Sequence, residues 1–465
     1  MTERDDAFDP FEALMRAEGL PEIAIETFRH YVGLLRGGQT GLIPEADILP
    51  VDDLPDADAL PPEVAGIGQR AIARAAMIKL NGGLGTGMGL EQAKSLLIVK
   101  EGLSFLDIIA RQALDAGAPL VLMNSFSTRD DSLAALAAHP ALSEGRALPL
   151  DFMQHKVPKI LVDGLGPARW PEDPELGWCP PGHGDIYTAL LTSGMLDAMR
   201  AAGLRYAFVS NADNLGAVLD PAILGHFVAS GQPFMMEVAD RTAADRKGGH
   251  LARRLDGQLI LRESAQCPPE DADAFQDTSR HRYFNTNSLW LDLDAVADAL
   301  AARQGVLGLP MIRNLKTLDP RRADSPPVYQ LETAMGSAIA VFEGAGALRV
   351  PRSRFAPVKA CQDLLRVRSD ACTLTDDFRV VPAEGTPEEP ADVVLDNAVY
   401  KTIDDLERRF PFGPPSLRAC LSLRVEGDVR FGRDVRVEGH VRLSNRSGAP
   451  VTIEDGAHLV ADRAW

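Results

Sequence analysis

The chain has 465 residues, of which 45% are hydrophobic and 25% charged, values typical of a globular protein with two or three domains. Its formal net charge of −18 argues against nucleic acid or an anionic membrane as partner, although lysines inside a cleft can still bind an anionic substrate. No apolar run is long enough to span a bilayer, the start lacks a secretory pattern, and five scattered cysteines without a CxxC pair disfavour a zinc or disulfide framework. We therefore expect a cytoplasmic protein with reduced thiols.

Residues 1–55 are expected to form a helical segment followed by a connector. Within residues 9–36, apolar side chains recur at helical spacing on both sides of the break GLP, which predicts two helices packed on a larger body. Residues 42–62 (LIPEADILPVDDLPDADALPP) are rich in proline and aspartate and are expected to be extended.

Residues 56–365 alternate between short apolar runs and helix-like stretches. This alternation predicts an α/β domain built on one sheet, with loops gathered at the carboxyl ends of the strands. The expected strands are AAMIKL (75–80), PLVLMN (119–124), RYAFVSN (205–211), PFMMEVA (233–239), GQLILRES (257–264) and TNSLWLDL (286–293). The expected helices span residues 104–117, 186–203 and 220–231.

Residues 366–465 are expected to be a linker followed by a repetitive domain. Two sets of apolar residues recur every six positions: Leu423, Val429, Val435 and Val441, and Val425, Phe431, Val437 and Leu443. The sixfold recurrence, with glycines between the runs, favours coils of a left-handed parallel β-helix over a plain strand meander. Such coils should pack on the sheet domain or on another subunit, so a homo-oligomer through this region is a possible assembly.

The stretch KLNGGLGTGMGLEQAKS (79–95) carries five glycines before a lysine, as phosphate-binding loops often do. A Walker A loop ending at Lys94 would need glycine where Ala93 and Met88 stand, and the dinucleotide fingerprint G-x-G-x-x-G cannot be threaded through residues 82–89. What remains is a strand followed by a loop whose backbone can approach a ligand closely. Lys94 would add a compact positive charge for phosphate.

This glycine run resembles a signature of the eukaryotic-type UTP–glucose-1-phosphate uridylyltransferases (UDP-glucose pyrophosphorylases), roughly L-N-G-G-L-G-T-S-M-G…K-S. Seven further blocks follow in the family's order: residues 119–132, 178–190, 208–220, 236–251, 284–293, 330–339 and 350–365. Seven blocks in order are not a chance match. The resemblance is dense over residues 75–365, and the C-terminal repeat is similar to the family's third domain.

The resemblance implies a Rossmann-like, GT-A-like nucleotidyltransferase domain with a mixed sheet, followed by a left-handed β-helix. It also implies the transfer of a uridylyl group from UTP to glucose 1-phosphate, which yields UDP-glucose and pyrophosphate. A phosphate monoester is largely dianionic at neutral pH, with a second pKa of about 6, so the attacking oxygen needs no general base. Catalysis then consists of positioning and charge neutralisation.

The substrates bring several negatively charged phosphates together, which requires cations, and the resemblance indicates which residues provide them. Lys94 is expected at the UTP phosphates, and Lys359, in APVKA, matches the family's catalytic lysine between the phosphates of both substrates. Lys359 stands between two apolar runs, which is unusual for a solvated surface lysine. Asp213 follows the apolar run YAFVS and is expected to hold Mg²⁺ together with the substrate phosphates; a turn-capping role beside Asn214 is the alternative.

The resemblance assigns the other contacts residue by residue. For UTP these are Leu80, Asn81, Gly82, Gly83, Lys94, Gln154, Gly182 and Asn211. For the sugar phosphate they are His183, Glu237, Gly249, Asn285, Asn287 and Lys359. The Gln154 amide can pair with one edge of uracil, whereas for Met123 a place beside the base and a place in the core are both open.

Three positions depart from the family pattern. Glu91 stands where a lysine is common, Gly87 where a serine is usual, and Cys179 where an aromatic residue is usual. A glutamate that pointed inward at position 91 would reverse a charge near the phosphates, and one that faced solvent would change little. These departures could change UTP affinity or metal dependence, but they do not touch the residues assigned to the reaction.

Three other functions compete with this interpretation. A UDP-N-acetylhexosamine or broad-specificity UDP-sugar pyrophosphorylase often has arginine after the threonine of the loop, where this chain has Gly87. A non-catalytic nucleotide-binding regulatory protein would not need Lys94, Asp213 and Lys359 together. A hexapeptide acyltransferase would need more coils and a catalytic histidine, for which His440 alone is thin support.

Overall fold

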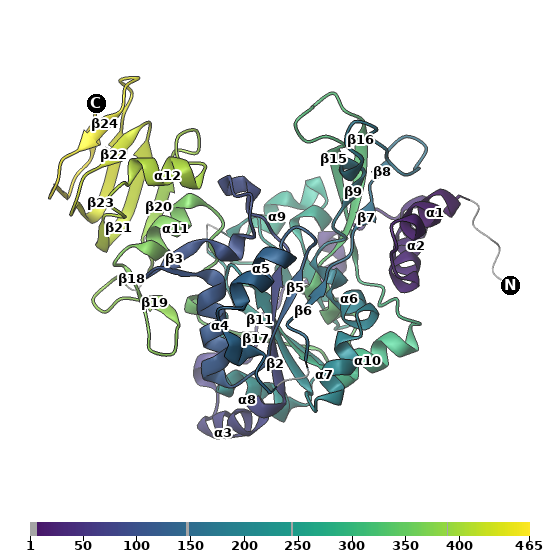
Figure 1. Cartoon of the computed structure of the whole chain (residues 1–465). Coiled ribbons are helices and arrows are strands. Elements are labelled where there is room, and N and C mark those ends of the chain that lie inside the picture. Colours follow the sequence, from purple (N-terminus) through teal and green to yellow (C-terminus); the bar gives the residue numbers. More distant parts are fainter. Residues whose placement is uncertain (1–6, 146–147, 243–244, 388) are drawn as a thin grey trace.

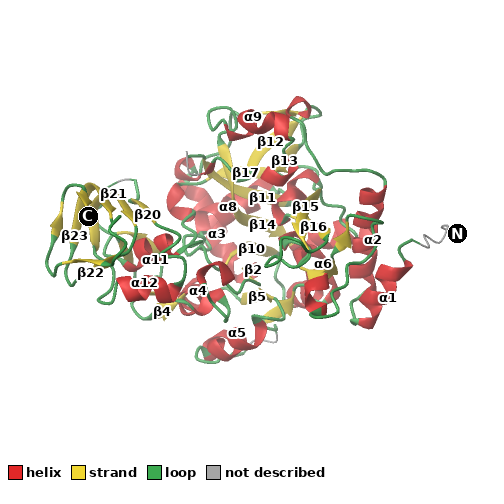
Figure 2. Ribbon diagram, turned by 90° about the horizontal axis from the view of Figure 1, so that it is seen from above, coloured by secondary structure: helices red, strands yellow, loops and turns green. Residues whose placement is uncertain are grey.

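The computed structural model describes residues 7–145, 148–242, 245–387 and 389–465. A central sheet with helices on both faces separates two smaller parts (Figures 1 and 2). Helices α1 (Asp9–Ala17) and α2 (Glu22–Arg36) lie on one side of it, and the C-terminal strands lie on the other. Among the described residues, no helix combines the length and the apolar character that a membrane crossing requires.

Parallel strands form one side of the ten-stranded sheet, in the order β10-β2-β5-β6, with β6 at the edge. Antiparallel β14 joins β10 to β11 and β12, while β1, β13 and β17 complete the far side. The strands are β1 (Ile48–Leu49), β2 (Ala75–Asn81), β5 (Leu120–Asn124), β6 (Asp151–Met153), β10 (Tyr206–Asn211), β11 (Phe234–Asp240), β12 (His250–Arg254), β13 (Leu259–Arg262), β14 (Tyr283–Asp292) and β17 (Gly346–Arg349). The sheet is therefore rich in parallel pairs and mixed, and the mixed character is what the family resemblance implies.

Successive side chains of the central strands face two different cores, because neighbouring residues of a strand point to opposite faces. In β2, Met77 packs in one core while Ala76 and Ile78 pack in the other. The first core includes residues of α4 (Phe105–Ala116), α8 (Pro221–Ser230) and α11 (Cys361–Arg368). The second includes residues of α6 (Ile186–Thr192), α7 (Met195–Ala201) and α10 (Leu293–Ala302). Helices α3 (Pro62–Ala71), α5 (Arg129–Leu136), α9 (Ala272–Gln276) and α12 (Ile403–Arg409) complete the set.

All six predicted strands are present, and the helices predicted over residues 104–117 and 220–231 are α4 and α8. The single helix predicted over residues 186–203 is wrong. Helix α6 ends at Thr192, the Ser193 hydroxyl donates back to the Ala189 carbonyl at 2.6 Å, and Gly194 takes a left-handed conformation with φ +73°. Hydrophobic spacing alone cannot reveal this break, because both helices bury the same kind of face.

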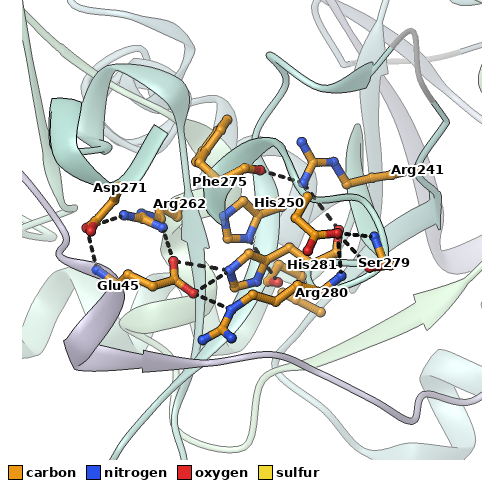
Figure 3. Close-up of polar contacts among 11 residues, drawn as sticks. Glu45, Arg241, His250, Arg262, Asp271, Phe275, Ser279, Arg280 and His281 are labelled. Atoms are coloured by element: carbon orange, nitrogen blue, oxygen red, sulfur yellow. Dashed lines mark hydrogen bonds and ion pairs between the residues drawn. The ribbon is translucent and has the colours of Figure 1, made fainter. Parts of the chain in front are cut away.

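The connector is partly ordered, in contrast to the extended segment that its composition predicts. It forms the turn Glu45–Asp47 and strand β1, which pairs with β12. The Glu45 carboxylate accepts hydrogen bonds from Arg262 and Arg280, both at 2.6 Å, and contacts the His281 ring (Figure 3). The fully buried Arg262 also pairs with Asp271 at 3.1 Å, so two carboxylates compensate its charge. This network ties the connector to β13 and to the segment before β14.

Helices α1 and α2 pack on two small sheets, β15-β16-β8 and β7-β9, which confirms the prediction that they pack on a larger body. Their core includes Phe11 and Phe28, and it is shared with Val157, Met311 and Leu331. The strands of this region are β7 (Val157–Pro158), β8 (Ile160–Leu161), β9 (Trp178–Cys179), β15 (Met311–Thr317) and β16 (Pro327–Thr333). The helical pair therefore packs against β7 and β9, next to residues 154–156 and 180–183.

The C-terminal strands pair in parallel, with Leu423 opposite Val441 and Val425 opposite Leu443. All eight residues of the sixfold repeat are buried, and they share the core of α4 and α11. A meander would pair neighbouring strands antiparallel, so that alternative is wrong. The strands are β20 (Asp392–Leu395), β21 (Ser416–Glu426), β22 (Val429–Phe431), β23 (Arg436–Ser444), β24 (Val451–Ile453), β25 (His458–Leu459) and β26 (Arg463–Ala464). Short pairs β3 (Ile98–Lys100) with β4 (Leu103–Ser104), and β18 (Cys372–Leu374) with β19 (Val380–Pro382), complete the structure.

Candidate active site

A cleft of about 740 Å³ opens where the parallel strands end. Its lining includes Asp213 after β10, Gly82 and Gly83 after β2, Ser125 to Ser127 after β5, and Gln154 to Lys156 after β6. The carboxyl ends of neighbouring parallel strands meet at one edge of a sheet, where α/β proteins commonly bind ligands. The sheet topology thus brings together loops from distant parts of the sequence.

Two lysines converge on one carboxylate in this cleft. The ammonium groups of Lys94 and Lys359 donate to the same oxygen, Oδ2 of Asp213, at 2.7 and 2.8 Å. Burial would raise the pKa of the Asp213 carboxyl, but the charges of Lys359 and Lys94 and their hydrogen bonds more than offset it, so the pKa is lowered. The carboxylate is therefore ionised at neutral pH, and the group of three carries one net positive charge.

The segment that carries Lys359 is fastened to the end of β10. The Asn214 side chain accepts a hydrogen bond from the Ala356 backbone at 3.1 Å and donates to the Arg354 carbonyl at 3.0 Å. The Val358 N–H donates to the Asp213 carbonyl at 3.1 Å. Lys359 is more than half exposed, with 58% of its side chain accessible, because the flanking apolar residues face the core while the lysine faces the cleft.

His183 presents a neutral ring to the cleft. Its Nδ1 accepts a hydrogen bond from the Met335 N–H at 2.9 Å. Burial and the positive charge of Lys359 lower the pKa of His183 to about 4. At neutral pH the other ring nitrogen, Nε2, therefore carries the proton and can donate a hydrogen bond.

Gly182 lies against the end of β16 and next to Gln154. The Gln154 amide donates to the Gly182 carbonyl at 3.1 Å. Gly182 has φ +81°, and a Cβ at this position would lie 2.4 Å from the Thr333 carbonyl oxygen. This backbone therefore requires glycine for both conformation and space.

We expect Gly182→Ala to lower the free energy of unfolding by about 2–4 kcal/mol, because the left-handed conformation and the contact with Thr333 both act against it. Chemical denaturation measures this change. Gly164→Ala is the matched control: its φ is +74°, but nothing lies within 4 Å of the added Cβ, so it should cost only about 1–2 kcal/mol. Equal losses in the two variants would contradict the steric argument.

Most of the residues that the sequence assigns to substrates line this cleft. They are Leu80, Asn81, Gly82, Gly83, Lys94, Gln154, Gly182, His183, Asn211, Asp213 and Lys359. Of the two other open positions, Met123 is buried in the sheet core, whereas Glu91 is exposed to solvent. A buried Met123 favours the core alternative for this residue.

Three other predicted residues form a second cluster outside that lining. The Asn285 N–H donates to the Gly249 carbonyl at 3.1 Å, and the Asn285 side chain donates to Asn287 at 2.9 Å. Glu263, which the sequence analysis missed, completes the cluster: burial raises the pKa of its carboxyl, and a hydrogen bond from Asn285 opposes that rise. A glutamate directly after the strand LILR was the available signal.

Glu237 belongs to neither group of residues. It is fully buried, and its carboxylate accepts two hydrogen bonds from Arg354, at 2.8 and 2.9 Å, and one from the Trp290 indole at 2.9 Å. Its oxygens are thus committed to protein partners rather than turned toward the cleft. In this structure Glu237 fixes Arg354, which belongs to the segment that leads to Lys359.

Known proteins that are similar to this chain indicate its family. A family model described as UTP–glucose-1-phosphate uridylyltransferase matches residues 36–438. The chain belongs to this family. The uridylyltransferase of Solanum tuberosum is 39% identical over 419 residues, covering 88% of this chain and 84% of the relative. That of Saccharomyces cerevisiae is 39% identical over 396 residues, covering 83% of this chain and 77% of the relative.

Solved structures of the family extend the match to the whole chain. A variant of UDP-glucose pyrophosphorylase from Leishmania major, in complex with UDP-glucose, is 43% identical, with a TM-score of 0.91 and complete coverage of both chains. A structure from Trypanosoma brucei, named UDP-glucose phosphorylase, is 44% identical, with a TM-score of 0.90, and covers 99% of this chain and all of that chain. The resemblance to the uridylyltransferases drawn from the sequence is confirmed.

An enzyme that transfers a uridylyl group is expected to use Mg²⁺ to neutralise phosphate charge, and the Asp213 carboxylate fits a Mg²⁺ ligand. Its Oδ1 is buried and has no hydrogen-bond partner, which leaves one carboxylate oxygen for a cation. Within the described ranges there is no group of three or more His, Cys, Asp or Glu side chains that could hold a metal by themselves. One carboxylate combined with substrate phosphates is a common Mg²⁺ arrangement.

Proposed function

We propose that this chain transfers the uridylyl group of UTP to glucose 1-phosphate, with UDP-glucose and pyrophosphate as products. The observation that carries the proposal is the convergence of Lys94 and Lys359 on Asp213 at one end of the cleft. Two ammonium groups that meet on one carboxylate can neutralise charge on the phosphates of two substrates. The membership of the uridylyltransferase family supplies the substrate class.

In the proposed reaction, an oxygen of the glucose 1-phosphate attacks the α-phosphorus of UTP in line. A bond forms between that oxygen and the α-phosphorus, and the bond from the α-phosphorus to the bridging oxygen breaks, so that its electron pair leaves with pyrophosphate. The substrate phosphate is already ionised, and no residue has to remove a proton. Lys359 would neutralise charge at the reacting phosphates and Lys94 at the UTP phosphates, while the neutral His183 would donate a hydrogen bond.

The remaining contacts are proposed from the same geometry. The backbone of Leu80 to Gly83, the Gln154 amide, Gly182 and Asn211 would hold the nucleotide. Gly249, Asn285 and Asn287, together with Glu263, would hold sugar hydroxyls, since carboxylate and amide groups suit them. Mg²⁺ on Asp213 would add positive charge at the UTP phosphates.

A turnover panel tests the proposal. The purified protein is incubated with UTP, Mg²⁺ and one sugar 1-phosphate at a time, and pyrophosphate release is measured. We expect the fastest release with glucose 1-phosphate. Faster release with N-acetylglucosamine 1-phosphate would indicate a UDP-N-acetylhexosamine pyrophosphorylase, and similar rates with many sugars would indicate a broad-specificity enzyme. Binding of UTP without any turnover would support a non-catalytic regulatory protein and reject the enzyme.

We also propose that residues 56–365 form a GT-A-like nucleotidyltransferase domain, whose sheet also takes up β1 of the connector, and that the C-terminal strands form a left-handed parallel β-helix. The parallel pairing of β21 with β23 and of β22 with β24 supports the coil. Val460 and Trp465 are exposed near the chain end, which supports a homo-oligomer through this region. All five cysteines are free thiols, which fits a cytoplasmic location.

A further inference from the structure

Phe126 is an exposed aromatic residue at the cleft. Its side chain is 67% accessible, yet it lines the cleft directly after Ser125, whose hydroxyl donates to the Gly82 carbonyl at 2.9 Å. A phenyl ring left in water forgoes the stabilisation that burial would give it. An exposed aromatic ring in a ligand cleft is therefore a candidate contact for an apolar part of the ligand.

Lys156 and Trp178 lie beside Phe126 in the same cleft lining. The Lys156 ammonium lies 5.7 Å from the centroid of the Phe126 ring and 4.9 Å from that of Trp178. It pairs with Glu18, at the end of helix α1, at 2.7 Å, and with Glu175 at 3.4 Å. We refer to Phe126, Lys156 and Trp178 together as the aromatic rim.

The order of the strands places the aromatic rim away from the phosphate end. Lys94 and Lys359 meet Asp213 beyond β10, whereas Phe126 follows β5 and Lys156 follows β6. Two inter-strand spacings separate β10 from β5, about 10 Å, and three separate it from β6, about 14 Å. A nucleotide whose phosphates lie at the lysine pair would therefore extend its base along the glycine loop toward the rim.

Charge separates the two ends in the same way. The lysine pair shares one carboxylate, so the phosphate end is positive overall. At the rim, one ammonium faces two carboxylates, Glu18 and Glu175, so this end repels a further anion. An uncharged ring with a polarisable face suits the rim, because aromatic side chains stack on bases.

We propose that the aromatic rim holds the uracil ring of the nucleotide, with Phe126 as the stacking residue and Glu18 as a positioning residue that acts through Lys156. This inference rests on the proposed function. It adds Phe126, Lys156 and Trp178 to the residues that the family resemblance assigns to UTP. It also gives helix α1 a role in nucleotide affinity. The Gln154 amide would read the edge of the base, while the rim would hold its face.

Kinetics of Phe126→Ala test the stacking contact. We expect the KM values for UTP and UDP-glucose to rise about 5- to 50-fold, with kcat within threefold of wild type and an unchanged KM for pyrophosphate in the reverse reaction. Phe126→Trp keeps a ring and should restore the UTP affinity to within about threefold. Phe412→Ala is the matched control, because Phe412 is half exposed and contacts Arg433 in the C-terminal region, away from the cleft.

An unchanged KM for UTP in Phe126→Ala would overturn the proposal, and so would an equal rise for pyrophosphate, which would place the contact at the phosphates. The wild-type protein is measured in the same assay, so that an inactive wild type rejects the proposed function rather than the rim. In that case, calorimetric titration with UTP still tests Phe126, because stacking requires binding only.

The positioning role of Glu18 has its own pair of variants. Glu18→Gln should raise the KM for UTP about 2- to 5-fold, the scale of a partly exposed ion pair, at constant kcat. Glu22→Gln is the control, since it removes a comparable pair, 2.7 Å from Arg16, in the same helical segment without contact to the cleft. Equal KM values for Glu18→Gln and wild type would remove the role of Glu18.

Discussion

Replacement of Lys359 with alanine is expected to lower kcat about 10³-fold. Its ammonium lies 2.8 Å from Asp213 Oδ2 and lines the cleft beside Lys94. The proposed reaction gathers several negative charges around one phosphorus atom, and a fixed cation stabilises the transition state more than the separated substrates. Steady-state kinetics with saturating UTP and glucose 1-phosphate measure the loss.

The fold should tolerate this change. The Lys359 side chain is 58% exposed, and the hydrogen bonds that hold its segment involve backbone groups, Asn214 and Asp363. We expect the free energy of unfolding to change by less than about 1 kcal/mol. Lys316→Ala, at an exposed position of β15 outside the cleft lining, should leave kcat unchanged. A kcat within tenfold of wild type for Lys359→Ala would contradict its catalytic role.

The sheet could be predicted because its strands are buried on both faces and read as continuous apolar runs. The ends of these runs also located the cleft, since Asn81, Asn124 and Asn211 each close a parallel strand. The break between α6 and α7 escaped the prediction for the opposite reason. It depends on a local hydroxyl-to-carbonyl bond at Ser193, and the apolar spacing continues through it.

Side-chain partners far apart in the sequence could not be predicted in this way. Glu237 lies in a strand whose register turns its side chain toward Arg354, a partner 117 residues away. The run MEVA alone therefore could not predict that Glu237 is buried. The place of Lys359 between two apolar runs is unusual for a solvated lysine, but those neighbours face the core and the Lys359 side chain is 58% exposed. The pairing of Lys156 with Glu18 likewise depends on where α1 docks, which hydrophobic spacing leaves open.

The second large effect is expected for Asp213→Asn. The substitution removes the negative charge that both lysine ammonium groups contact, and it changes the oxygen, Oδ1, that has no partner in the folded chain. If this carboxylate holds Mg²⁺, the Mg²⁺ concentration for half-maximal activity should rise at least about 10-fold, with a large loss of kcat at low Mg²⁺. Activity measured across a Mg²⁺ titration at fixed UTP gives both quantities.

A purely structural role for Asp213 predicts a different pattern. If the carboxylate only formed ion pairs with the two lysines, its neutralisation would free both ammonium groups for the phosphates. The KM for UTP would then fall, while the Mg²⁺ concentration for half-maximal activity would stay unchanged. That result would contradict the metal-binding role. Asp197→Asn, at a position of α7 that is 79% exposed, controls for the loss of one negative charge and should change neither quantity. The two roles thus differ in the metal dependence, which the Mg²⁺ titration measures, and a lower KM for UTP in a separate UTP titration would mark the structural role.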